Sequence, residues 1–152
     1  MSNVTSLTQF TSTAEQAANQ VIKAYSTSFG LAARLLGARH RQHVRNIYAL
    51  VRVADEIVDG MTAEAGLASA EQSATLERFI AETHLALRLG CSSDLVIHAF
   101  ARTARECGID ASLTQPFFDS MRLDLGHDTA SPTRLVRFDS DTHAHYVYGS
   151  AE

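Results

Sequence analysis

The chain has 152 residues, of which 45% are hydrophobic and 20% charged, a composition typical of one globular domain and not of a disordered or fibrous protein. Its formal net charge of −4 argues against nucleic-acid binding, which requires a basic face. No apolar run approaches the ~18 residues of a transmembrane helix, and the Ser/Thr-rich start lacks the basic and apolar regions of a secretory signal. We therefore expect a cytoplasmic protein.

The first predicted helix begins at Thr13, where Thr13-Ala-Glu-Gln16 has the pattern of a capping box. Residues 1–12 are expected to form a flexible N-terminus. The hydroxyl-rich run Tyr25, Ser26, Thr27 and Ser28 interrupts this helix, and Ser28 is placed to cap a short second helix over residues 29–36. Hydroxyls and free N–H groups before a helix can also converge on an anion. N-capping and anion binding are thus both open for this run.

A long helix is predicted over residues 39–59, and it separates an apolar arc from one polar stripe. At about 100° per residue, four polar side chains project within ~40° of one another: Tyr48, Arg52, Asp55 and Asp59. Carboxylates one turn apart can hold Mg²⁺, which prefers one or two carboxylates plus substrate phosphates. An arginine beside them suits phosphate oxygens. The stripe predicts a site for a magnesium diphosphate.

The alternative is an ordinary solvated face, because paired acids four residues apart are common on exposed helices. Only one narrow stripe of this helix is polar, however, and charges confined to such a stripe usually face a cleft or pair with one another. This context favours the site over the solvated face.

Four further helices are predicted after a loop over residues 60–68. They span residues 69–89, 93–107, 112–125 and, beginning near the chain end, 141–148. Gly90 and Gly108 stop the first two, and Pro116 is tolerated in the first turn of the third. No segment alternates with period two for long enough to form a strand, so the fold class is all-α.

Several other polar groups are interpreted as structural. Asp119, Arg122 and Asp124 predict an ion-pair network, and the cysteines, Cys91 and Cys107, are expected to be free and buried. The histidines 127, 143 and 145 are assigned to ordinary surface or core positions. The basic cluster at the start of the 39–59 helix is interpreted as a solvated N-terminal turn, with the alternative that Arg41, on the stripe of Tyr48 and Arg52, helps to attract diphosphate; its members are Arg39, His40, Arg41, His43 and Arg45.

Short motifs occur in order along the chain: Tyr25-Ser-Thr-Ser28-Phe29, Ala33-Arg-Leu-Leu36, Arg45-Asn-Ile-Tyr48-Ala-Leu-Val-Arg52, Ala54-Asp55-Glu56-Ile-Val-Asp59-Gly60, Phe117-Phe-Asp119-Ser-Met121-Arg122 and Tyr146-Val-Tyr148-Gly149. Together they resemble the squalene/phytoene synthase family, the head-to-head trans-isoprenyl diphosphate synthases, from about residue 20 onward. The Asp-Glu-Ile-Val-Asp-Gly form is more similar to bacterial phytoene synthases than to squalene synthases.

The resemblance implies a helical bundle of the isoprenoid-synthase type and a prenyltransferase of carotenoid biosynthesis. The implied reaction joins two geranylgeranyl diphosphates head to head through a cyclopropyl diphosphate intermediate. The implied catalytic residues are Tyr48 and Arg52, and both would also contact the substrate diphosphate together with Tyr25, Ser26, Thr27 and Ser28. Asp55 and Asp59 would bind Mg²⁺, with Glu56 as a further candidate ligand and Mn²⁺ as an alternative ion. A peripheral membrane contact would suit the lipophilic product.

Members of this family are longer and carry a second aspartate-rich motif on a later helix. Asp124 and Asp128 share the spacing, but Gly126 and the residues after it predict a helix end there. Residues 13–152 are therefore expected to be the N-terminal part of a synthase domain, truncated before the second motif, inactive alone and prone to self-association. The alternative is a non-catalytic helical remnant that binds magnesium diphosphate weakly or only oligomerises.

Overall fold

The computed structural model describes residues 4–25 and 37–128, and every regular element within them is a helix. The predictions for Ser26, Thr27, Ser28 and the helices over 29–36 and 141–148 fall outside these residues. The helices are α1 (Ser6–Tyr25), α3 (Ala38–Asp59), α4 (Met61–Glu64), α5 (Ser69–Leu89), α6 (Leu95–Cys107) and α7 (Ala111–Asp128). The described part of the chain contains no strand, which confirms the all-α prediction.

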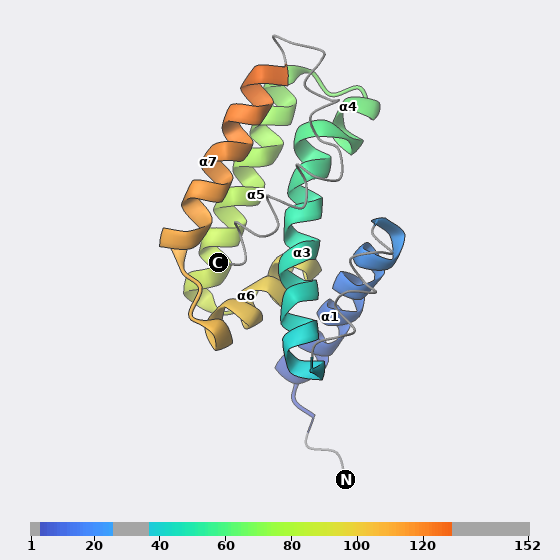
Figure 1. Ribbon diagram of the computed structural model, residues 1–152, viewed down its shortest axis with the longest axis vertical. Helices are drawn as coiled ribbons and strands as arrows, with labels where there is room; N and C mark the ends of the chain where they lie inside the picture. The colour runs from blue at the N-terminus through green and yellow to red at the C-terminus, as the bar shows by residue number, and fades with distance from the viewer. Residues whose placement is uncertain (1–3, 26–36, 129–152) are drawn as a thin grey trace.

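Helix α3 is the central element of the bundle. Figure 1 shows it between α1 on one side and the neighbouring pair α5 and α7 on the other, with α6 near the lower end. It contacts every other described helix. A helix surrounded in this way must be apolar over most of its circumference, and the predicted apolar arc is buried: Ile47, Leu50, Val51, Ala54, Ile57 and Val58.

Two kinds of packing hold α3 in place. Large side chains of α3, α5, α6 and α7 form the main core, in which Leu76, Phe79, Phe100 and Phe118 are all buried. Burying such a side chain contributes about 1.5–3 kcal/mol relative to leaving it exposed. Helix α1 instead meets α3 and α6 through small residues that allow close approach of the backbones: Ala14, Ala18, Ala49 and Ala99.

The start of α1 differs from the prediction. The helix begins at Ser6, after Thr5, whose Oγ1 accepts a hydrogen bond from the Thr8 N–H at 3.1 Å. Thr13 lies inside the helix and donates its hydroxyl to the Gln9 carbonyl at 3.0 Å, so the capping-box prediction was wrong. Residues 6–12, predicted as part of the N-terminus before the first helix, lie within α1, and Thr11 is hydrogen-bonded to His98 of α6.

The later helix boundaries agree more closely with the sequence. Gly90 and Gly108 end α5 and α6 in left-handed conformations, with φ of 87° and 74°. The predicted loop over 60–68 contains the single-turn helix α4, and α7 continues through Gly126 to Asp128, past the predicted end at residue 125. Asp124 and Asp128 therefore lie on one helix. Pro116 lies in the second turn of α7 and not in its first.

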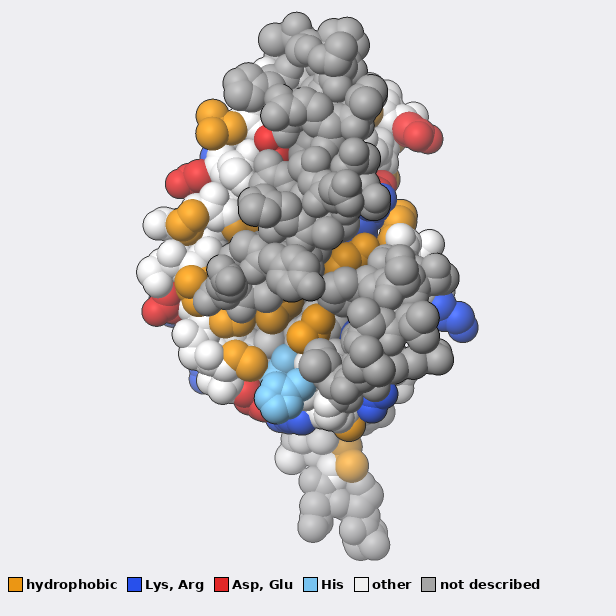
Figure 2. Space-filling view, viewed as in Figure 1, with side chains coloured by type: hydrophobic (Ala, Val, Ile, Leu, Met, Phe, Trp, Pro, Cys, Tyr) orange, Lys and Arg blue, Asp and Glu red, His pale blue; other side chains and the backbone are white. Residues whose placement is uncertain are grey.

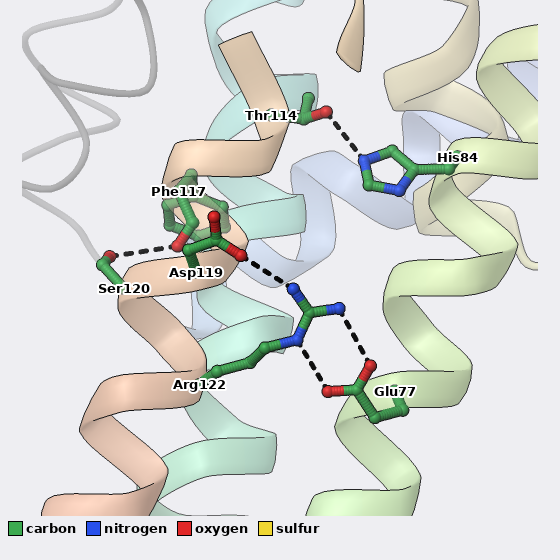
Figure 3. A network of polar contacts seen from close by, with 7 residues as sticks. All are labelled: Glu77, His84, Thr114, Phe117, Asp119, Ser120 and Arg122. Atoms are coloured by element: carbon green, nitrogen blue, oxygen red, sulfur yellow. Dashed lines mark hydrogen bonds and ion pairs between the residues drawn. The ribbon is translucent and has the colours of Figure 1, made fainter. Parts of the chain in front are cut away.

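An ion-pair network joins α5 to α7 (Figure 3). The guanidinium of Arg122 forms two parallel bonds with Glu77, from Nε to Oε2 at 2.7 Å and from Nη2 to Oε1 at 2.9 Å, and a third from Nη1 to Asp119 at 2.8 Å. The pairing with Arg122 lowers the pKa of Glu77. The predicted pairing of Arg122 with Asp119 is confirmed. The sequence did not identify Glu77, because only the fold brings α5 beside α7.

Both cysteines are free and exposed, so the prediction that they are buried was wrong. They occupy helix ends: Cys91 follows the stop of α5, and Cys107 is the last residue of α6. Hydrophobic side chains also remain exposed on the face in Figure 2, and the exposed leucines of α5 and α7 are Leu85, Leu89, Leu113 and Leu123. Among the described helices, none combines the length and apolarity needed to cross a membrane.

Candidate functional site

The predicted polar stripe lies on successive turns of α3, in the half of the helix that ends at Gly60. Tyr48 is 3% exposed and Asp55 7% exposed, whereas Arg52 and Asp59 are half-buried. A solvated helix face would leave these side chains open to water. The burial therefore disfavours the solvated-face alternative and places two carboxylates and a guanidinium within the packed protein.

Tyr48 is the most buried member of the stripe. Its ring packs with Ile22 of α1 and Val51 of α3, and Phe117 of α7 lies against the same cluster. Three helices, α1, α3 and α7, therefore meet at Tyr48. Its ring belongs to the polar stripe and also packs these helices together. The predicted catalytic position is thus also a packing position.

Arg52 is held by two neighbours. Its Nη2 forms an ion pair with Glu56 Oε2, one turn further along α3. Its guanidinium carbon lies 4.3 Å from the centre of the Tyr25 ring at the end of α1, in a cation–π contact. Tyr25, predicted as a diphosphate ligand, therefore contacts the predicted diphosphate-binding arginine.

Glu56 uses both of its carboxylate oxygens within the protein. Oε2 binds Arg52, and Oε1 accepts a hydrogen bond from the backbone N–H of Met61 at 3.1 Å. The side chain is 18% exposed, against 26% for Arg52. Glu56 was a further candidate ligand for the metal, but its oxygens are engaged with an arginine and a backbone donor.

Asp55 and Asp59 supply the hard oxygen atoms that a magnesium site needs. They lie one turn apart on one rigid helix, the spacing that the sequence predicted. Within residues 4–25 and 37–128, no three His, Cys, Asp or Glu side chains gather closely enough to hold a metal by themselves. A pair of carboxylates nevertheless fits Mg²⁺, because this ion commonly takes one or two carboxylates and completes its coordination with water and substrate phosphates.

A buried polar network fixes α3 against α1 and α6, and the sequence analysis did not identify it. Asn46 is fully buried; its Oδ1 accepts from Gln42 at 2.8 Å, and its Nδ2 donates to Thr103 at 2.8 Å and more weakly to Glu15 at 3.4 Å. Gln42 also donates to Asn19 of α1 at 3.1 Å. Asn46 stands between Arg45 and Ile47, so no sequence pattern marked it as buried.

The basic start of α3 is also paired. Arg39 forms an ion pair with Glu106 of α6, and His43 Nε2 lies 3.2 Å from the same carboxylate. The pKa of Glu106 is lowered, chiefly by its hydrogen bond with Arg39. Thr103 Oγ1 lies 2.9 Å from His43 Nδ1. These two residues of the predicted basic cluster therefore join α3 to α6, and the cluster is not wholly a solvated helix start.

His98 of α6 contacts the first half of α1 and holds it against α6. Its Nδ1 accepts a hydrogen bond from the Ser92 N–H at 3.2 Å, so the neutral ring carries its proton on Nε2, which lies 2.9 Å from Thr11 Oγ1. The rings of Phe10 and His98 pack edge to face, with 4.8 Å between their centres. Burial, with a smaller effect of Arg102, lowers the pKa of His98 below its ordinary value.

A cavity of about 460 Å³ lies between the start of α5 and the end of α7, lined by Ser69, Ser73, Leu76, Glu77, Arg122 and Leu125 among others. None of the predicted site residues lines it. Its charged groups, Glu77 and Arg122, are already paired with each other. The cavity is therefore separate from the polar stripe of α3.

Comparison with protein families matches residues 22–152 to the family described as squalene/phytoene synthase. No curated protein and no solved structure matches the chain. The matched segment contains α3 and the whole polar stripe, as well as Tyr25.

Proposed function

Because the chain belongs to the squalene/phytoene synthase family, the head-to-head prenyltransferases, we propose that α3 is its diphosphate-binding helix. We further propose that the reaction is of the phytoene synthase type, in which two geranylgeranyl diphosphates are joined. The observation that carries this proposal is the pairing of Asp55 and Asp59 one turn apart on a buried helix, with Arg52 one turn before them.

The three charged residues have two different roles in binding a diphosphate. Arg52 donates hydrogen bonds to the phosphate oxygens, since a guanidinium presents several donors in one plane. Asp55 and Asp59 would hold Mg²⁺, with Mn²⁺ as an alternative. The bound ion would neutralise negative charge on the leaving diphosphate. Because these side chains are fixed on one helix, they need little rearrangement as that charge develops.

The proposed chemistry begins when the allylic C–O bond of one substrate breaks and its electron pair leaves with the diphosphate. The double bond of the second substrate attacks the resulting allyl cation, and loss of a proton closes a cyclopropyl diphosphate. A second ionisation, rearrangement and proton loss give the linear hydrocarbon. Such cations react with water, so an apolar wall is needed. Phe117, partly buried against Tyr48 and Ile22, is the candidate for that wall.

The test is made in the full-length protein and replaces each carboxylate by its amide, in Asp55→Asn and Asp59→Asn. We expect hydrocarbon formation from geranylgeranyl diphosphate and Mg²⁺ to fall at least ~100-fold, because the ion loses a charged ligand, while far-ultraviolet circular dichroism stays unchanged. Asp119→Asn is the matched control, since Asp119 is an exposed acid that pairs with Arg122 on α7. Near-wild-type rates in both site variants would refute the proposal.

A second candidate is a helical protein that binds magnesium diphosphate without turning it over. It uses the same three residues of α3, Arg52, Asp55 and Asp59, so product formation and not binding distinguishes it from the synthase. Calorimetric titration of the 152-residue chain with magnesium pyrophosphate separates the two candidates when combined with a product assay. Binding that depends on Asp55 and Asp59 without any hydrocarbon product would support the second candidate.

A further inference from the structure

Glu56 lies between Arg52 and the turn that ends α3. Its Oε2 binds the Arg52 guanidinium, and its Oε1 accepts the Met61 N–H at 3.1 Å. The backbone of Gly60 completes the arrangement, since its N–H is bonded to the Glu56 carbonyl at 3.1 Å. The carboxylate is therefore enclosed by the chain that follows it.

Because Gly60 has no side chain, the Glu56 carboxylate can lie against its backbone. A Cβ at position 60 would lie 2.6 Å from Glu56 Oε1 and 2.9 Å from its carboxyl carbon. Contacts that short do not occur, so any larger residue would displace the end of the Glu56 side chain. Because that end is flexible, the displacement would cost the fold little while moving the carboxylate away from Arg52.

These contacts fix the orientation of the Arg52 guanidinium in the absence of a ligand. Tyr25 covers one face of the guanidinium, and Glu56 occupies Nη2. The buried Nε of Arg52 makes no hydrogen bond among the described residues. A buried donor without an acceptor is uncommon and calls for an explanation. A phosphate oxygen is a suitable acceptor for this donor once the Arg52 side chain turns toward a bound ligand.

We propose that Glu56 is a positioning residue that aims Arg52 at the substrate diphosphate, and that Gly60 is required because only glycine leaves room for this carboxylate. The inference rests on the proposed function, in which Arg52 binds the diphosphate. It assigns to Glu56 a role different from that of Asp55 and Asp59: Glu56 acts through the arginine and not through the metal.

The two roles predict different kinetics, measured in the full-length protein. A positioning residue affects the KM for the prenyl diphosphate, whereas a metal ligand affects the Mg²⁺ concentration needed for half-maximal rate. In Glu56→Ala we expect the KM to rise about tenfold or more, the usual effect of losing a group that orients a ligand-binding side chain. The half-saturating Mg²⁺ concentration, measured at saturating substrate, should stay within about twofold of the wild type.

Gly60→Ala is the sharper variant because it keeps every charge. It should raise the KM in the same direction as Glu56→Ala, since the new Cβ would lie only 2.6 Å from the present position of Oε1. Gly37→Ala is the matched control: it lies at the other end of α3, and a Cβ there meets nothing within 4 Å. Glu64→Gln, on the exposed side of α4, controls for the loss of a nearby acidic charge.

A double-mutant cycle shows whether Glu56 acts through Arg52. In an Arg52→Lys background, Glu56→Ala should add less than about twofold to the KM, because residues that act as a unit are not additive. Independent, multiplicative effects would overturn the proposal. A shift in the Mg²⁺ requirement of Glu56→Ala with an unchanged KM would overturn it as well.

The inference can fail separately from the proposed function. If Asp55→Asn and Asp59→Asn abolish turnover while Gly60→Ala and Glu56→Ala leave the KM unchanged, the positioning role is wrong and the diphosphate site stands. If the two aspartate variants keep full activity, the proposed function itself is wrong. Melting temperatures of all variants identify any loss that arises from unfolding.

Discussion

Replacement of Asn46 tests the network that places α3, the helix of the candidate site, against its neighbours. Asn46 has no exposed surface and joins α3 to α6 through Thr103, while Gln42 extends the network to Asn19 of α1. We expect Asn46→Ala to destabilise the protein, because it removes these bonds from a site that water does not reach.

The magnitude follows from the contacts. Asn46 makes two hydrogen bonds of 2.8 Å and a longer one of 3.4 Å to Glu15. Each good bond contributes about 0.5–1.5 kcal/mol, and the space left by the amide adds about 1 kcal/mol. Thr103 keeps its contact with His43, and Gln42 keeps its contact with Asn19, so neither partner is left unsatisfied. The sum is about 2–4 kcal/mol.

The assay is urea denaturation followed by circular dichroism, with the free energy of unfolding obtained by linear extrapolation. Asn19→Ala is the matched control, because the half-buried Asn19 accepts only one bond in this network, at 3.1 Å from Gln42. It should cost about 1 kcal/mol. Asn46→Asp should be at least as destabilising as Asn46→Ala, since it removes the donors to Thr103 and buries a charge.

The result that would refute this reasoning is a loss for Asn46→Ala no larger than that for Asn19→Ala. That outcome would mean that packing of the neighbouring alanines, and not the polar network, sets the position of α3. The network also has a functional consequence: it holds α1, whose last residue, Tyr25, contacts Arg52. Asn46→Ala should therefore raise the KM for the prenyl diphosphate as well.

Three further predictions concern the site, the pH dependence and the core. Arg52→Lys should lower turnover at least ~10-fold, because lysine keeps the charge but loses the planar donor array, while calorimetry shows only a small change in melting temperature; equal losses of stability and activity would contradict the diphosphate role. Because the folded pKa of His98 is lowered, the unfolded chain binds more protons, so the free energy of unfolding should fall as the pH drops through the ordinary value of 6.5, and urea titrations of His98→Gln should show a weaker pH dependence. Phe118→Ala, at a fully buried position between Phe79 and His84, should cost about 3–5 kcal/mol by urea denaturation, and a loss below ~2 kcal/mol would show that the core can collapse around the vacancy.

The sequence alone determined the features that depend on local geometry. The helical period placed Tyr48, Arg52, Asp55 and Asp59 on one stripe, since residues three and four apart share a helix face whatever surrounds them. Gly90 and Gly108 marked the ends of α5 and α6 because both adopt positive φ, which other residues rarely do. The order of short motifs identified the family, which the match over residues 22–152 confirmed.

Only the tertiary structure decided which hydrogen-bond or ion-pair partner each polar side chain has. Glu56 could have joined the metal ligands, but the turn after Gly60 encloses its carboxylate against Arg52 and Met61. The start of α1 could not be read from a capping pattern, because packing of Thr11 on α6 stabilises two earlier turns. These choices depend on contacts between residues distant in the chain, which periodicity and composition do not encode.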